Sequence, residues 1–168
     1  MAELKNAKML GGIGAILSVI GLGFIGFILK LLAVKQISEA TGNEDIFNKY
    51  LWAAITNIIG GIIVFGSFMA AIRSGKFGVG VLGLGGFIAV VLLIVGAWFM
   101  KQSYDLIAEE TGVGMFHTVA LLYIVGAILM IFLIGGLLIA IAAILEIVAY
   151  FSLPDTLEKS SPTPTAEF

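Results

Sequence analysis

Two polar side chains inside apolar stretches are the clearest candidates for chemistry in this sequence. Asn57 lies early in one apolar segment, and Glu146 lies in the last third of another. An ionisable side chain is costly in lipid, so Glu146 is a candidate to bind a proton or a cation, or to pair with a basic neighbour. The alternative places Glu146 near or beyond the membrane interface, because about twenty helical residues already cross a bilayer. Asn57 is more typical of an interhelical hydrogen bond than of a ligand.

The sequence offers no other arrangement that is typical of an enzyme or a metal site. It contains no cysteine and a single histidine, His117, which excludes thiolate sites and any site with several histidines from one chain. Gly78, Gly80 and Gly83 have the spacing of a phosphate-binding loop, but apolar segments flank them and no strand precedes them. We therefore predict no catalytic residue, no metal, no cofactor and no enzymatic activity.

Small residues four positions apart recur in every apolar segment. In a membrane helix such residues let two backbones approach closely, so that packing and weak hydrogen bonds hold the helices together. Two interpretations remain open, namely an interface with another subunit and packing among the helices of the chain itself. The candidate residues are Gly14, Ser18, Gly66, Ala70, Gly85, Ala89, Gly136 and Ala140.

The composition indicates that a bilayer surrounds these segments. Of the 168 residues, 60% are hydrophobic and 12% are charged, which is more apolar and less charged than a soluble domain. The net charge of −2 provides no basic face for nucleic acid. Each of four segments contains the roughly twenty apolar residues that a spanning helix needs. The predicted spans are residues 9–34, 51–72, 77–100 and 119–153.

The last of these segments is too long for a simple crossing. Either it forms one long helix that projects beyond the membrane, or it breaks at Gly135 and Gly136 into two short pieces. We favour one long helix, because no polar loop lies at the glycine pair and a break in lipid would leave backbone groups unpaired. Residues 1–153 then form the membrane domain. Residues 154–168 contain all three prolines and are predicted to form a flexible tail.

Two polar connections resemble each other at an offset of 70 residues. Residues 37–42 read Ile-Ser-Glu-Ala-Thr-Gly, and residues 107–112 read Ile-Ala-Glu-Glu-Thr-Gly. One interpretation is a duplicated hairpin, with two parallel copies in the chain. The other is ordinary helix-ending chemistry, with Gly42 and Gly112 just past the last turn. The predicted fold is an all-α integral membrane protein with four long transmembrane helices, arranged as two helical hairpins.

The orientation follows from the shortest connection, where basic residues act most strongly on topology. Arg73 and Lys76 lie there, so the positive-inside rule favours both termini in the cytoplasm and the two long connections outside. Trp52, Trp98 and Tyr104 fit the belt of aromatic residues at the membrane surface.

Several segments in a distinctive order carry a resemblance to a known family. The sequence resembles an archaeal family of predicted membrane proteins that is classed only as a domain of unknown function. The resemblance covers about residues 8 to 154, and it implies an archaeal origin and a plasma-membrane location. It implies no activity, substrate or catalytic residue. The segments that carry it are Met9–Gly14, Ala33–Ser38, Ile46–Phe47, Tyr50–Leu51, Ile107–Gly112, Phe116, Leu121–Tyr123, Gly126 and Ala149–Pro154.

The sequence therefore favours a non-enzymatic structural or accessory subunit of a membrane complex. Its expected partners are the lipid bilayer and either other membrane subunits or further copies of the same chain, with no nucleic acid. The second interpretation is a small homo-oligomeric transporter or channel. Such a protein needs a polar stripe through the membrane, for which the candidates are Thr56, Asn57, Ser67 and Glu146.

Overall fold

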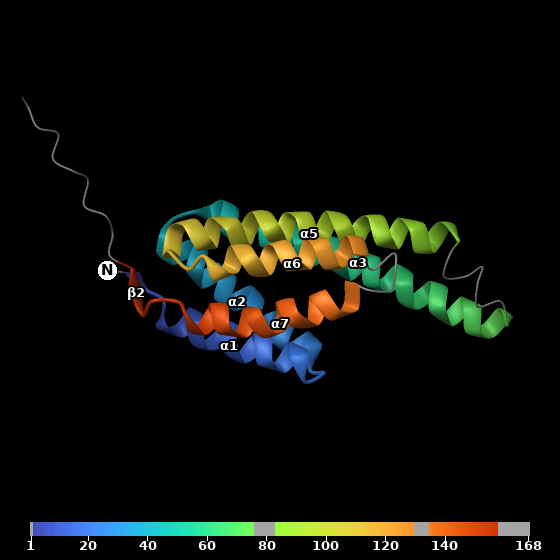
Figure 1. Ribbon diagram of the computed structural model, residues 1–168, viewed down its shortest axis with the longest axis horizontal. Coiled ribbons are helices and arrows are strands. Elements are labelled where there is room, and N and C mark those ends of the chain that lie inside the picture. Colours follow the sequence, from blue (N-terminus) through green and yellow to red (C-terminus); the bar gives the residue numbers. More distant parts are fainter. Residues whose placement is uncertain (1, 76–82, 130–134, 158–168) are drawn as a thin grey trace, which may run out of the picture.

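The computed structural model describes residues 2–75, 83–129 and 135–157, which form six helices and two very short strands. Strand β1 (Ala2–Glu3) pairs antiparallel with β2 (Thr156–Leu157), which brings the two ends of the described chain together. The prediction of a flexible tail remains a prediction for residues 158–168, which lie outside the described residues. The helices, shown in Figure 1, are α1 (Lys5–Val19), α2 (Gly23–Thr41), α3 (Glu44–Ser74), α5 (Leu84–Thr111), α6 (Met115–Leu129) and α7 (Gly135–Phe151).

The prediction of a single membrane crossing over residues 9–34 is wrong, because the chain turns back on itself at Gly21. This glycine has a φ of 95°, a left-handed conformation that favours glycine, and it separates α1 from α2. The two helices then pack closely. A Cβ atom added to Gly26 would lie only 2.4 Å from the carbonyl oxygen of Gly14, so glycine on both sides permits the contact. Residues 9–34 thus belong to a short hairpin rather than to one crossing.

The single long helix predicted over residues 119–153 is also wrong. The segment forms α6 and α7, and α7 begins at Gly135, where the alternative interpretation placed the break. The residues between them, 130–134, lie outside the described part of the chain. Gly126 permits close packing here too, since its missing Cβ would lie 2.8 Å from the side chain of Ile139. At 15 and 17 residues, both helices are shorter than a full crossing needs.

Within residues 2–75, 83–129 and 135–157, two helices, rather than the predicted four, are long and apolar enough to cross a membrane. They are α3 over Glu44–Ser74 and most of α5 over Gly85–Thr111. Their apolar side chains face outward, as Phe65 and Phe87 show with exposed fractions of 65% and 67%. In the core helix of a soluble protein these side chains would be buried, so the exposure favours a membrane environment.

The molecule has two regions, which we call the base and the arm. The arm consists of residues 61–75 of α3 and 83–89 of α5, and the base contains the rest of the described chain. Figure 1 shows the α3–α5 pair extending well beyond the shorter helices, which gather around the end where β2 lies, paired with β1. The connections after Thr41 and Thr111 lie at that same end. They were predicted to lie opposite the ends of the chain, but they lie on the same side as the paired strands β1 and β2, because the first and last predicted spans are hairpins that return the chain.

The two similar connections adopt the same helix-ending structure. Gly42 and Gly112 both have a φ of 75°, and their amides donate to the carbonyl oxygens of Ser38 and Ala108, each at 2.9 Å. The threonine before each glycine donates its hydroxyl to the carbonyl of the isoleucine four residues earlier. The expected C-terminal caps are confirmed. The connections α2–α3 and α5–α6 therefore begin with the same cap geometry.

Candidate functional site: a buried lysine–glutamate pair

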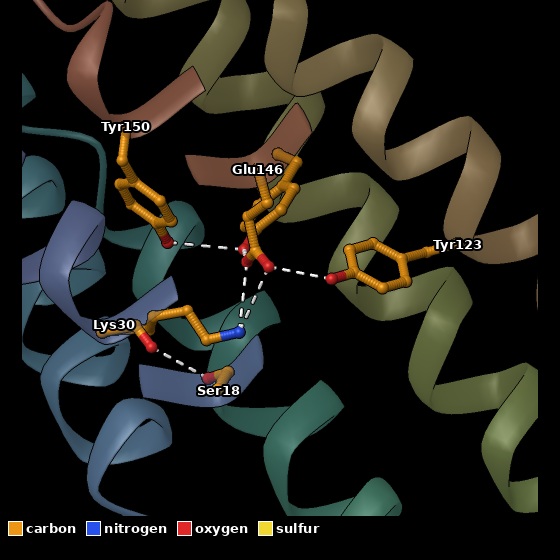
Figure 2. A network of polar contacts seen from close by, with 7 residues as sticks. Ser18, Lys30, Tyr123, Glu146 and Tyr150 are labelled. Atoms are coloured by element: carbon orange, nitrogen blue, oxygen red, sulfur yellow. Dashed lines mark hydrogen bonds and ion pairs between the residues drawn. The ribbon is translucent and has the colours of Figure 1, made fainter. Parts of the chain in front are cut away.

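Glu146 lies at the centre of a polar cluster in the base. It belongs to α7 and is only 1% exposed. The ammonium nitrogen of Lys30, on α2, lies 3.2 Å and 3.3 Å from its two carboxylate oxygens. The Tyr123 hydroxyl on α6 donates to Oε2 at 2.8 Å, and the Tyr104 hydroxyl on α5 donates to Oε1. Figure 2 shows Lys30 and Tyr123 pointing toward the carboxylate of Glu146 from opposite helices.

The cluster depends on the two short hairpins. Lys30 and Glu146 lie 116 residues apart, and each stands in a segment that was predicted to be a single crossing. Because the chain reverses at Gly21, α2 carries Lys30 back into the bundle. The return of the chain after α6 brings Glu146 opposite it. The carboxylate therefore lies inside the protein. The depth of Glu146 relative to the membrane interface stays a prediction.

Aromatic rings enclose the pair on one side. The rings of Tyr104 and Phe116 meet edge to face with 5.3 Å between their centroids, and Phe116 meets Tyr150 in the same way at 5.1 Å. The hydroxyls of Tyr104 and Tyr150 lie 3.3 Å apart, and Tyr50 stacks on Tyr104. This packing keeps water from the ion pair and lowers the local dielectric, which strengthens its attraction.

Burial of two charges is unfavourable unless they are paired and hydrogen-bonded. Glu146 meets this condition with three donor side chains, Lys30, Tyr104 and Tyr123. Across the described residues, every fully buried side-chain nitrogen or oxygen has a hydrogen-bond partner. Removal of Lys30 or Glu146 would leave an uncompensated buried charge, and removal of either tyrosine hydroxyl would take a hydrogen bond from the carboxylate. The cluster therefore fixes the mutual arrangement of α2, α5, α6 and α7.

Two open cavities adjoin the lysine side of the pair. The larger has a volume of about 370 Å³ and the smaller about 250 Å³. Both are lined by Lys30, Asn57 and Met100. The larger cavity is otherwise mostly apolar, with Val90, Leu93, Ala97, Tyr123, Ala127 and Ile139 in its wall.

Asn57 belongs to this site because it lines the same two cavities as Lys30, and not because it contacts Glu146. It lies on α3 against Gly96 of α5, where an added Cβ would come within 2.3 Å of the amide oxygen. Asn57 therefore occupies the space that the missing side chain of Gly96 leaves. The two polar candidates named from the sequence thus flank Lys30, with Glu146 on one side and the cavity wall that contains Asn57 on the other.

Half of the small-residue candidates lie against helices of the same chain. Gly14 crosses Gly26 as described above, and a Cβ on Gly85 would lie 2.9 Å from the hydroxyl of Ser67. These contacts join α1 to α2 and α3 to α5. The residues of this group are Gly14, Ser18, Gly85 and Ala89.

The other half face outward. Gly66 and Ala70 lie on the arm, and Gly136 and Ala140 lie near the start of α7, all of them exposed. A Cβ added to Gly66 or Gly136 would meet nothing within 4 Å. These four residues are therefore open to lipid or to another protein.

Three members of the site were not predicted from the sequence, and a fourth was misplaced. Lys30, Tyr123 and Tyr150 were not named as candidates. Tyr104 was expected at the membrane surface but is fully buried, whereas Trp52 and Trp98 are more than half exposed. A signal for the pair was present, because Lys30 and Glu146 are the only charged residues within the four predicted spans.

His117 does not belong to the cluster. It is exposed at the start of α6, and its Nδ1 lies 2.6 Å from a carboxylate oxygen of Asp105. Among the described residues, no three His, Cys, Asp or Glu side chains gather as a metal site would require.

Comparison with known proteins identifies relatives without a described activity. The model of a family described as "Protein of unknown function (DUF996)" matches residues 22–144. The chain is 38% identical over 173 residues to "Uncharacterized protein MJ1644" of Methanocaldococcus jannaschii, and the match covers 95% of this chain and 98% of the relative. No solved structure matches the chain.

Proposed function

The chain belongs to this family of unknown function, which is present in archaea, and from its structure we propose that it is a non-enzymatic integral membrane protein that serves as a structural or accessory subunit. The observation that carries the proposal is the arm. Two helices project from a well-packed base, and they expose apolar and small residues along their length. A soluble environment would not tolerate this surface, and a membrane partner could pack against it.

The base supports a structural role in a second way. In the described part of the chain, the buried Glu146 carboxylate accepts from donors on three other helices, which is what a rigid support requires. A partner could then dock on the arm without disturbing the base. Gly66 and Ala70 provide the close-approach surface on α3, because they lie four residues apart on one helix face.

Substitution of Gly66 by isoleucine tests this proposal. The change fills an exposed site that has no neighbour within 4 Å, so the fold should be retained. We expect the intact particle, extracted gently from its native membrane, to lose mass and partner subunits. Gly61→Ile is the matched control, since Gly61 is equally free of neighbours but points about 140° away around the helix. Equal particle masses for both variants and the parent chain would contradict the proposal.

The orientation belongs to the same proposal. Lys5, Lys8, Lys35 and Lys49 belong to the base, whereas Arg73 is the basic residue of the described part of the arm. By the positive-inside rule, the base faces the cytoplasm together with the paired strands β1 and β2. The chain contains no cysteine, so single cysteines placed at Asp155 and Ser74 can be labelled from either side of sealed vesicles. Labelling of Asp155→Cys by a reagent that reaches only the outer side of the cell membrane would contradict the proposed orientation.

A small transporter is the second candidate, and one observation favours it. A buried ion pair lies directly beside an open cavity, as in sites where an ionisable group carries a proton or an ion. Reconstituted protein with Glu146→Gln should then lose proton or cation flux. Absence of flux in the parent chain, or equal flux in the variant, would eliminate this candidate.

A further inference from the structure

We propose that the larger cavity binds an uncharged membrane amphiphile, with a small hydrogen-bonding head between Lys30 and Asn57 and an apolar chain along Leu93, Ala97 and Ile139. The cavity has the size and character of a small-molecule site, because its volume is about 370 Å³ and its wall is apolar apart from a few polar groups. This inference does not depend on whether the arm binds a partner.

The strongest indication of a ligand is the amide of Asn57. In the described part of the chain this amide has no protein hydrogen-bond partner, although it lines both cavities. Asn57 is the fourteenth of the 31 residues of α3, so it lies near the middle of a helix that could span the bilayer. Water is scarce at that depth, and an unpaired amide is costly there. A polar head bound in the cavity would satisfy it.

Lys30 provides the second donor. An ammonium group has three hydrogens, and Lys30 directs two hydrogen bonds to the oxygens of Glu146. One donor is therefore left for the cavity, which Lys30 also lines. A hydroxyl or carbonyl oxygen could accept from Lys30 while it also pairs with the amide of Asn57.

Because the site has no net charge, it favours a ligand with an uncharged head group. Lys30 and Glu146 form a pair with no net charge, and their charged groups lie 3.2 Å apart. An anion that approached Lys30 would also meet the carboxylate, and a cation would meet the ammonium group. Either would have to leave water without a counter-ion of its own. The depth of the site also excludes a large zwitterionic head, which remains at the membrane surface.

Photoactivatable probes of equal chain length test the inference. We would incorporate hexadecanol, hexadecyl sulfate and hexadecyltrimethylammonium, each with a diazirine in its chain, into liposomes that contain the full-length protein. Labelled peptides would be mapped by mass spectrometry. We expect hexadecanol to label the cavity wall at Leu93, Ala97 and Ile139, and the two charged probes to label it about tenfold less.

Matched variants localise the head of the probe. Asn57→Leu removes the amide at nearly constant volume and should lower the labelling of the wall by hexadecanol about fivefold. Thr56→Val is the control, because the Thr56 hydroxyl bonds to the carbonyl of Trp52 in its own helix. Ala127→Phe narrows the cavity with Asn57 intact, so it replaces Asn57→Leu if that variant does not fold. It should also reduce labelling.

The outcomes separate this inference from the proposed subunit role. Labelling that spreads evenly over the apolar surface, equal labelling by a charged probe, or no response to Asn57→Leu and Ala127→Phe would overturn the inference. Gly66→Ile should change the particle mass but leave probe labelling of the cavity unchanged. A failure of one proposal is therefore visible without a failure of the other.

Discussion

The base and the arm of this molecule are held together by different kinds of contact. The largest fully buried side chains, among them Tyr104, Tyr150 and Phe116, all lie in the base. In the arm, the buried side chains that the structure describes are those of Ala71 and Ala89. The base thus has a core of large rings around an ion pair, whereas the arm relies on two helices that approach closely at small residues.

This difference shows two solutions to packing in one chain. Lipid is as apolar as the side chains themselves, so helices in it gain little from burying apolar area and associate through close packing. The arm follows this rule. The base adds a polar cluster that several helices must complete together, which specifies their arrangement. Substitutions should therefore have large effects in the base and small effects in the arm.

The largest effect is expected when one member of the ion pair is removed. Glu146→Ala leaves the Lys30 ammonium buried without its counter-ion, and we expect the free energy of unfolding to fall by about 3–5 kcal/mol. Unfolding by added dodecyl sulfate in mixed micelles, followed by circular dichroism, measures the change. The double variant Lys30→Met with Glu146→Leu removes both charges and should recover most of the loss. If Glu146→Ala is as stable as the parent chain, the cluster does not hold the base together.

The crossing of α1 and α2 provides the next test. Gly26→Ala places a Cβ atom 2.4 Å from the backbone oxygen of Gly14, and backbone cannot move aside as a side chain can. We expect a loss of about 3 kcal/mol, the upper part of the usual range for overpacking. The same unfolding assay applies.

Gly23→Ala is the control for this substitution, because a Cβ there meets nothing within 4 Å in the same helix. Equal stability of the two variants would mean that α1 and α2 do not form the tight hairpin described above. The first predicted span would then regain support.

The short hairpins could not be predicted from the sequence, for a physical reason. Gly21 is one of several glycines in an apolar run, and the packing of Gly14 on Gly26 that accompanies the turn cannot be read from neighbouring residues. The last predicted span has the same problem. One long helix was favoured because a break in lipid would leave backbone groups unpaired, but α6 packs against α7, which one straight helix could not do.

Local signals were more informative. The helix-ending glycines were predicted correctly, since a left-handed cap depends on neighbours in the sequence. The site could be predicted only in part. Glu146 was a candidate because a charge in an apolar segment needs a partner. That this partner is Lys30 depends on both hairpins, which bring the two residues together. Tyr104 was misplaced because burial on α5 is decided by the helices that fold over it.

The two matching caps should respond equally to the same change. Gly42→Ala and Gly112→Ala each force an alanine into a conformation with φ near 75°, and we expect each to lower the free energy of unfolding by about 1–2 kcal/mol. Gly114→Ala is the control, because it lies beside the second cap without a positive φ or a close neighbour. Clearly unequal losses would indicate that the two connections only resemble each other in sequence.

The smallest effect is expected in the arm, and its sign is opposite. Gly61→Ala adds a methyl group that meets nothing within 4 Å, while alanine favours the helix more than glycine does. We expect the protein to be unchanged or to gain up to about 1 kcal/mol in the same unfolding assay. The adjacent Gly60 faces α5, where an added Cβ would lie 3.4 Å from the Cβ of Leu92, so Gly60→Ala should be less favourable. If Gly61→Ala were as damaging as Gly26→Ala, another element would have to cover the arm within the same chain. The contrast between a packed base and an open arm would then fail, and with it the argument that the arm is free to meet a partner.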